Sequence, residues 1–375
     1  MKIVIAPDSF KGSLTATEAA DAIEIGFRAV YPDAEYVKVP MADGGEGTVQ
    51  SLVDATSGTI INQSVIGPMG DMVSGFFGIL GCSRTAVVEM AAASGIHLVK
   101  PEERNIYLAS SFGTGQLINA ALDHGCDKLI IGLGGSATND GGMGMMKALG
   151  AQFLGQGGAP LAPDVRALLQ LAKIDLQYLV PRLSKTEIVV ACDVNNPLCG
   201  ENGASRIFGP QKGATEDDIV VLDKALARYG DVLAISTGRN IAVEPGAGAA
   251  GGLGAALIGL IDAVLKPGVD LVIEIVELAK ILVDTNLVIT GEGRIDSQTI
   301  HGKTPIGVAK IAKSHNLPVI CIAGSVEDGA DIIHQIGIDE IYSVIEGDYD
   351  LTEALIEAGH KLTQAAQKIA KSLNL

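Results

Sequence analysis

The stretch KIVIAPDSFKGSLTATEAADAIEIGFRAVYPDAEYVKV, residues 2–39, decides the fold class. It begins with a short β-branched run that Pro7 ends, and apolar residues at helical spacing follow from Thr15 onward. Thr15 and Glu18 have the spacing of a capping box, which marks the start of a helix. A second short strand at 36–39 completes a strand–helix–strand unit, which is typical of a parallel sheet. We therefore predict an α/β protein.

The end of the chain shows the same alternation of strands and helices. We expect strands at 287–290, 318–323 and 340–345, and helices at 305–314 and 351–372. The middle differs, because residues 59–89 alternate strand-like segments with turns, as in an antiparallel meander. We therefore predict one parallel-sheet domain from residues 1–57 plus 286–375. The second domain, a mixed α/β insertion, covers residues 58–285.

Composition excludes several classes of protein. The 375 residues include 27 basic and 44 acidic ones, a net charge of −17 that would repel a nucleic-acid backbone. The five cysteines are odd in number and form no Cys-x-x-Cys pair, so we expect buried free thiols in a reducing compartment. No signal peptide and no apolar run of membrane-spanning length is visible. We expect a cytoplasmic protein without nucleic-acid or membrane partners.

Glycine is frequent, at 47 residues, and it gathers in polar clusters near predicted strand ends, where open α/β sheets bind ligands. The richest cluster is GLGGSATNDGG, residues 132–142. Its backbone N–H groups can cradle a phosphate, although it lacks the lysine of a P-loop. A turn without a ligand would rarely need so many glycines. The candidate ligand residues in this cluster are Gly134, Gly135, Ser136, Asn139 and Asp140.

Two clusters near the N-terminus carry charge. Residues 6–13 bring Asp8, Ser9 and Lys11 into one loop after a strand, where the lysine could contact a phosphate. In MADGGEGT, residues 41–48, Asp43 and Glu46 stand among glycines, which suits a metal, a sugar hydroxyl or general-base work. A capped helix start and a plain turn are the structural alternatives.

Three further clusters follow other predicted elements. Ser111 precedes a helix whose free N–H groups could bind an anion, or it simply caps that helix. Asp193 follows a buried strand and could hold Mg²⁺, accept a hydroxyl proton or form an Asx turn. The last cluster, a glycine loop predicted after strand 287–290, contributes mixed charges from Glu292, Arg294, Asp296 and Lys303.

The segment GAGAAG, residues 246–251, matches the dinucleotide pattern G-x-G-x-x-G. The residues before it make a poor strand, so close backbone packing is the favoured interpretation. Three functions stay open on this reasoning. The first is a small-molecule kinase, the second a nicotinamide-dependent dehydrogenase of a small hydroxy acid that uses this segment, and the third a non-catalytic protein that binds anionic metabolites.

The clusters together resemble the type-1 glycerate kinase family of bacteria. The matching stretches occur in order along nearly the whole chain: APDSFKGSLTA at 6–16, MADGGEGT at 41–48, SSFGTGQLI at 110–118, GLGGSATNDGG at 132–142, ACDVNNPLCG at 191–200, FGPQKGA at 208–214, PGAGAAGGLG at 245–254 and TGEGRIDSQTIHGKTP at 290–305. The resemblance implies phosphorylation of D-glycerate to 2- or 3-phosphoglycerate with ATP and Mg²⁺. It also implies a flavodoxin-like domain with an inserted restriction-endonuclease-like domain.

A kinase needs phosphate cradles, cations, a metal carboxylate and a base. We predict Asp193 as base or Mg²⁺ ligand, and Asp296 as a second metal ligand. Arg294 can make a bidentate fork to the glycerate carboxylate, while Lys11 or Lys303 contacts phosphate oxygens. The remaining predicted substrate- or phosphate-binding residues are Asp8, Ser9, Asp43, Glu46, Ser111, Gly134, Gly135, Ser136, Asn139, Asp140 and Glu292.

Overall fold

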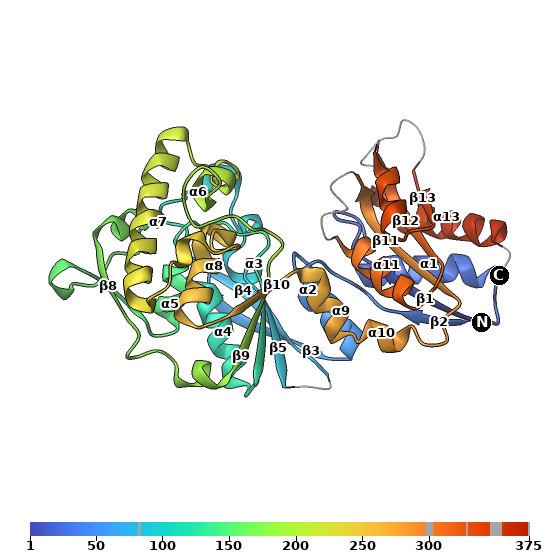
Figure 1. Cartoon of the computed structure of the whole chain (residues 1–375), viewed down its shortest axis with the longest axis horizontal. Helices are drawn as coiled ribbons and strands as arrows, with labels where there is room; N and C mark the ends of the chain where they lie inside the picture. The colour runs from blue at the N-terminus through green and yellow to red at the C-terminus, as the bar shows by residue number, and fades with distance from the viewer. Residues whose placement is uncertain (82–83, 297–302, 328, 346–354, 374–375) are drawn as a thin grey trace. The chain divides into compact units, whose positions relative to one another are not determined.

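The computed structural model describes residues 1–81, 84–296, 303–327, 329–345 and 355–373. It divides into two compact units (Figure 1). Unit 1 comprises Met1–Asp43, Gln50–Thr56 and Pro267–Leu375, and unit 2 comprises Gly44–Val49 and Ser57–Lys266. The main chain of unit 1 is thus interrupted by unit 2, and each unit has its own sheet and core.

Unit 1 is built on a five-stranded parallel sheet in the order β13-β12-β11-β1-β2. Its strands are β1 (Lys2–Pro7), β2 (Glu35–Lys38), β11 (Leu287–Ile295), β12 (Val319–Val326) and β13 (Glu340–Ser343). Numbered along the chain within this unit, the spatial order is 2-1-3-4-5. The order of addition reverses between β1 and β11, so the topological switch point of this sheet lies between these two strands.

Helices cover both faces of this sheet, which explains why its central strands are apolar throughout. Ile3 and Ile5 of β1 face a core formed with α1 (Ala16–Arg28) and α13 (Ala358–Ser372). α11 (Thr304–Ser314) contacts β1, β11 and β12 but contributes nothing to that core, so it covers the opposite face (Figure 1). The predicted capping box is confirmed, since Thr15 and Glu18 cap α1 reciprocally.

The helices α9 (Gly268–Ile275) and α10 (Leu278–Ile281) group with unit 1, whereas the composition-based boundary at residue 286 assigns them to the insertion. The close packing of α9 on α11 accounts for this difference. A Cβ at Gly307 of α11 would lie only 2.4 Å from Cγ2 of Val269 on α9. Such a close approach requires glycine and gives these helices a common interface.

Unit 2 contains a six-stranded mixed sheet in the order β10-β9-β6-β5-β4-β3. β3, β4 and β5 pair antiparallel, as the predicted meander requires, and the pairs from β5 to β10 are parallel. β7 and β8 form a separate antiparallel pair. The bounds are β3 (Thr59–Ile66), β4 (Met72–Ile79), β5 (Thr85–Glu89), β6 (Lys128–Gly132), β7 (Gln152–Gly155), β8 (Leu171–Asp175), β9 (Glu187–Ala191) and β10 (Val264–Lys266).

The helices of unit 2 bury one large apolar core against this sheet. α4 and α5 pack so closely that a Cβ at Gly115 would lie 2.3 Å from the Met145 carbonyl oxygen. None of the helices in the described part of the chain is long and apolar enough to cross a membrane. The helices that begin in or belong to unit 2 are α2 (Thr48–Thr56, which continues into unit 1), α3 (Ala91–Ser94), α4 (Phe112–Asp123), α5 (Met143–Ala148), α6 (Ala204–Phe208), α7 (Glu216–Thr237) and α8 (Ala249–Leu260).

One expected loop is a strand. The sequence predicted that the strand beginning at Leu287 ends at residue 290, but β11 continues to Ile295. Its extension pairs with β12 up to the partners Ile295 and Val326. A Cβ at Gly291 would lie 2.2 Å from the Ile322 carbonyl oxygen, so this glycine allows close strand pairing and does not break the strand. Residues 297–302 of the same cluster lie outside the described residues.

Candidate active site

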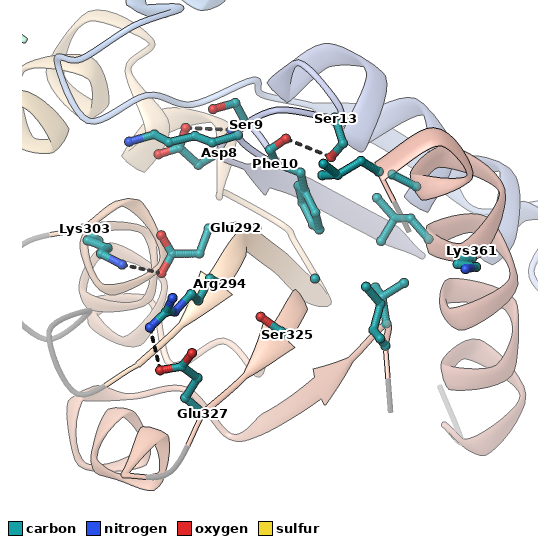
Figure 2. A pocket seen from close by; sticks show the side chains of 18 of the residues that line it. Asp8, Ser9, Phe10, Ser13, Glu292, Arg294, Lys303, Ser325, Glu327 and Lys361 are labelled. Atoms are coloured by element: carbon teal, nitrogen blue, oxygen red, sulfur yellow. Dashed lines mark hydrogen bonds and ion pairs between the residues drawn. The ribbon is translucent and has the colours of Figure 1, made fainter. Parts of the chain in front are cut away.

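A pocket of about 390 Å³ lies in unit 1 at the carboxyl ends of β1 and β11, next to the topological switch point (Figure 2). Figure 2 shows Glu292, Arg294 and Lys303 on the opposite side of this pocket from Lys361. The charged lining residues are Asp8, Lys11, Asp43, Glu292, Arg294, Lys303, Glu327 and Lys361. The apolar lining residues are Phe10, Val344, Ile345, Leu355, Ala358 and Leu362.

Asp8 is the most buried of the charged lining residues that β1 and the loop after it supply, with 6% of its surface exposed. The Ser9 amide donates to Oδ1 at 2.6 Å, and the Thr304 hydroxyl donates to Oδ2 at 2.5 Å. Burial, together with the like charge of Asp43, raises the pKa of Asp8 to about 6 despite these hydrogen bonds. The carboxylate is therefore ionised at neutral pH but has an unusually high affinity for a proton.

The cations of the pocket all have acidic neighbours. Lys11 Nζ lies 3.6 Å from an Asp43 oxygen, and this carboxylate is the main cause that raises the pKa of Lys11. Lys303 Nζ lies 3.6 Å from Glu292 and 3.9 Å from an Asp296 oxygen. Neighbouring carboxylates therefore balance the positive charge that is available to bind an anion. They also fix the positions of the cations around the cavity.

Arg294 belongs to the exposed part of β11. Its Nη2 donates to Glu327 at 2.6 Å, and its Nε lies 3.7 Å from Asp296. The Arg294 side chain is more than half exposed, and its two acidic partners do not use all five of its N–H donors. Of the predicted site residues, unit 1 thus gathers eight in and around one pocket. They are Asp8, Ser9, Lys11, Asp43, Glu292, Arg294, Asp296 and Lys303.

The predicted phosphate loop follows β6 in unit 2. Only Gly134 and Gly135 of its candidate residues are exposed, whereas Ser136, Asn139 and Asp140 are buried. Gly135 has a φ of +71°, which favours glycine. Asn139 donates to the Ser205 hydroxyl at 3.0 Å. The surface that this loop offers to a ligand is therefore the tip at Gly134 and Gly135.

The carboxylate of Asp140 lies at the start of α4, where the sequence suggested that an external anion could bind. One of its oxygens accepts from the Ser111 amide at 2.9 Å and from the Ser111 hydroxyl at 2.8 Å. The same carboxylate accepts from the amides of Gly142 and Gly144, each at 3.0 Å. Ser111 and Asp140 therefore join the loop to the first turn of α4 inside unit 2.

Lys212 was not among the predicted residues, although it lies beneath this loop. Its ammonium is buried and donates to the Ser136 hydroxyl at 2.8 Å and to the Thr138 carbonyl at 2.6 Å. Burial lowers the pKa of Lys212 to about 7, although Asp140 opposes this effect. Lys212 lies in the stretch FGPQKGA, which carries part of the family resemblance, but nothing in that stretch shows that the lysine is buried beneath the loop.

Glu89 is a second buried charge that the sequence did not reveal. It ends β5, and its Oε1 accepts from the Val49 amide at 2.7 Å, at the start of α2. Burial raises the pKa of Glu89. This contact holds the segment 44–49 against the β6 loop, where a Cβ at Gly134 would lie 3.0 Å from the Gly45 Cα.

Two other predicted site residues, Glu46 and Asp193, belong to unit 2. Glu46 is exposed in the segment 44–49, and Asp193 is exposed two residues beyond β9. Asp193 belongs to unit 2 and Asp296 to unit 1, so neither unit by itself contains both predicted metal ligands. Within the described ranges, no group of three or more acidic, histidine or cysteine side chains is arranged to hold a metal ion.

The segment 246–251 packs against other backbone. A Cβ at Gly251 would lie 2.0 Å from the Thr138 carbonyl oxygen, and one at Gly248 would lie 2.2 Å from that of Pro197. These glycines are needed for close packing beneath the β6 loop, which agrees with the favoured interpretation of the sequence. The four cysteines within the described residues, Cys126, Cys192, Cys199 and Cys321, are free thiols.

Comparison with known proteins decides among the three functional hypotheses. The sequence profile of the glycerate kinase family matches residues 3–374. The chain belongs to the glycerate kinase family. A glycerate kinase of Bacillus subtilis is 54% identical over 375 residues, covering 100% of this chain and 98% of the relative. The glycerate 2-kinase of Escherichia coli is 52% identical over 373 residues, again covering 100% of this chain and 98% of the relative.

A solved crystal structure supports the same membership. It comes from Salmonella typhimurium LT2, is described as a candidate glycerate kinase 2 and is 50% identical to this chain. Its TM-score is 0.91, and the match covers 99% of this chain and 98% of the solved one. The glycerate kinase family therefore accounts for both units, and neither the dehydrogenase nor the non-catalytic hypothesis is needed.

Proposed function

We propose that this chain transfers the terminal phosphoryl group of ATP to glycerate. The observation that carries this proposal is the family match across residues 3–374, which leaves neither unit unexplained. The chemistry of the unit 1 pocket agrees with it, because phosphoryl transfer depends mainly on positioning and on balancing charge.

The unit 1 pocket is our proposed nucleotide site. Its volume of about 390 Å³ falls in the range of sites for drug-sized ligands and is larger than a three-carbon acid requires. The apolar residues, including Phe10 and Leu362, suit a purine ring. Lys11 and Lys303 suit phosphate oxygens, and the exposed part of the Arg294 fork suits the glycerate carboxylate.

Mg²⁺ fits this chain as an ion that arrives with the nucleotide. Mg²⁺ usually takes one or two protein carboxylates, with water and substrate phosphates as its other ligands, so a cage of three acidic residues is not required. We propose Asp296, next to the cations of the pocket, as its carboxylate ligand in unit 1. The exposed Asp193 remains our candidate for a metal-binding carboxylate in unit 2. When bound, the metal would neutralise charge on the phosphates.

The tip of the β6 loop is a second proposed anion site. Gly134 and Gly135 are exposed and glycine leaves their N–H groups accessible, so we propose that they contact an anionic group of a substrate. Ser136, Asn139 and Asp140 would support the tip from beneath. The exposed Glu46 and the half-buried Ser9 remain candidates for hydrogen bonds to substrate hydroxyls.

Three finer assignments accompany this function. We propose that unit 1 is flavodoxin-like, since its 2-1-3-4-5 strand order is that of flavodoxin. For unit 2, the restriction-endonuclease-like topology implied by the family resemblance remains our proposal. The cytoplasm, with its reduced thiols, remains the proposed compartment.

We further propose that the phosphate goes to the hydroxyl on C2, as the name of the Escherichia coli relative suggests. The test incubates the protein with Mg²⁺, ATP and D- or L-glycerate, and measures ADP. Enolase is then added without phosphoglycerate mutase. We expect ADP with D-glycerate and immediate formation of phosphoenolpyruvate. ADP formation without phosphoenolpyruvate would assign the 3-position, and no ADP with either enantiomer would refute the kinase.

A further inference from the structure

We propose that Asp8 is the general base that takes the proton from the glycerate hydroxyl during phosphoryl transfer. This inference rests on the proposed kinase activity and goes beyond it by giving one buried side chain a chemical role. The sequence predicted Asp8 only as a binding residue, and it predicted Asp193 as the base or a Mg²⁺ ligand.

The position of Asp8 is the first reason. It directly follows β1 at the switch point of the sheet, and it lines the pocket together with Lys11 and Lys303. The rigid β1 strand, paired on both sides by β11 and β2, fixes the backbone that carries the carboxylate. A catalytic group requires such a fixed support, because small displacements from the reacting atom reduce the rate.

The hydrogen bonding of Asp8 is the second reason. A carboxylate has about four lone-pair positions, and the Ser9 amide and the Thr304 hydroxyl each use one. The two donors orient the carboxylate and leave acceptor capacity for a substrate hydroxyl. Figure 2 shows Asp8 and Glu292 along the same side of the pocket, and Lys303 Nζ lies 3.6 Å from Glu292, so a cation is present on the side where Asp8 lies.

The surrounding charges give Asp8 a suitable basicity. Asp43 and burial raise its pKa to about 6, while Lys11 and the two hydrogen bonds oppose that rise. Glu292, Arg294, Lys303 and Glu327 are the other charged groups at this side of the pocket (Figure 2). A base with a pKa near 6 is largely ionised at neutral pH, yet it binds a proton far better than an exposed aspartate does.

The reaction balances with Asp8 in this role. The glycerate hydroxyl oxygen forms a bond to the terminal phosphorus of ATP while the bond from that phosphorus to the bridging oxygen breaks. ADP leaves with the electron pair, and the hydroxyl proton passes to the Asp8 carboxylate. At neutral pH the protonated Asp8 then returns its proton to water, because the solvent pH lies above its pKa.

The first test is Asp8→Asn, assayed for ADP formation from D-glycerate. The asparagine can accept from the Ser9 amide and donate to the Thr304 hydroxyl, so the fold should persist, and thermal unfolding checks this point. We expect kcat to fall about 10²- to 10⁴-fold while ATP affinity changes little. An active wild type with a near-wild-type Asp8→Asn would refute the base role alone. An inactive wild type would refute the proposed function itself.

The second test uses Thr304→Val with Thr304→Ser as its matched control. Valine removes the hydroxyl that stabilises the ionised Asp8, so the acid limb of the kcat/KM profile should move to higher pH. Serine keeps the hydroxyl, and its acid limb should stay at the wild-type position. ATP and glycerate titrate identically with all three proteins, so they cannot produce a difference. Coincident acid limbs in all three would overturn the proposal, even if Asp8→Asn failed to fold.

Discussion

Gly134 and Gly135, at the tip of the β6 loop, form our proposed second anion site. Gly135 has a φ of +71°, and a Cβ there would lie 3.4 Å from the Ala91 Cβ, an ordinary contact. Alanine therefore fits the space at this position. Its only expected cost is the positive-φ backbone conformation, which destabilises the fold by roughly 1–2 kcal/mol. Any further loss in the variant has to come from the ligand side.

We predict that Gly135→Ala raises the KM for ATP or glycerate beyond what its lower stability explains. The matched control is Gly157→Ala, because Gly157 has a similar φ of +80° with no atom within 4 Å of the added Cβ. Both variants should lose comparable unfolding free energy in chemical denaturation, while only Gly135→Ala changes a KM. Equal kinetics in the two variants would show that the loop tip does not contact a substrate.

The sequence predicted some residues of the site and missed others for a physical reason. Asp8 and Lys11 were found because glycine and hydroxyl residues cluster around them after a strand. Lys212 and Glu89 were missed because each is a single charge in its segment, and its burial depends on contacts with residues far away in the sequence. The partners of Lys212, for example, precede it by more than seventy residues.

At the scale of elements, short-range patterns predicted helix starts better than strand ends. The capping box of α1 is local, so Thr15 and Glu18 were sufficient to locate it. The end of β11 depends on pairing with β12, whose residues follow much later in the chain. Glycines that suggested a loop there instead permit two strands to approach closely.

The buried contact between Lys212 and the β6 loop predicts how the stability of the fold depends on pH. Burial lowers the pKa of Lys212 from 10.5 to about 7, so between these values the unfolded chain binds a proton that the folded chain does not. The contribution of Lys212 to the free energy of unfolding is therefore highest above pH 10.5, where Lys212 is neutral in both states. It decreases as the pH falls toward 7, because protonation of Lys212 favours the unfolded chain. Lys212→Met lacks this dependence.

Urea unfolding of the wild type and Lys212→Met at pH 7 and at pH 9.5 tests this sign. The stability of the variant relative to the wild type should be higher at pH 7 than at pH 9.5. The hydrogen bonds lost to Ser136 and Thr138 shift both measurements alike and cancel in the comparison. Lys224→Met serves as the control, because it removes an exposed lysine from the same unit. A pH-independent difference would contradict a buried, destabilised charge.

At the scale of the whole molecule, the division into two units follows from packing that the composition could not show. The change in sequence pattern suggested a boundary at residue 286, because the regular strand–helix alternation resumes there. The compact units divide at Lys266 and Pro267 instead. The packing of α9 on α11, which brings Val269 against Gly307 across a long stretch of sequence, groups α9 with unit 1.

The assignment of α9 to unit 1 predicts which strands lose stability when the α9–α11 interface is overpacked. Gly307→Val places a branched side chain against Val269, which lies 2.4 Å from the position of the added Cβ, and such overpacking costs typically 1–3 kcal/mol. Hydrogen exchange should accelerate in β1, β11 and β12 of unit 1 and stay unchanged in β5, β6 and β9 of unit 2. The matched control, Gly115→Val between α4 and α5, should produce the reverse pattern, because its Cβ meets the Met145 carbonyl at 2.3 Å. If either variant accelerated exchange equally in both units, the two cores would unfold as one cooperative body, since local destabilisation spreads only as far as the packing that couples it.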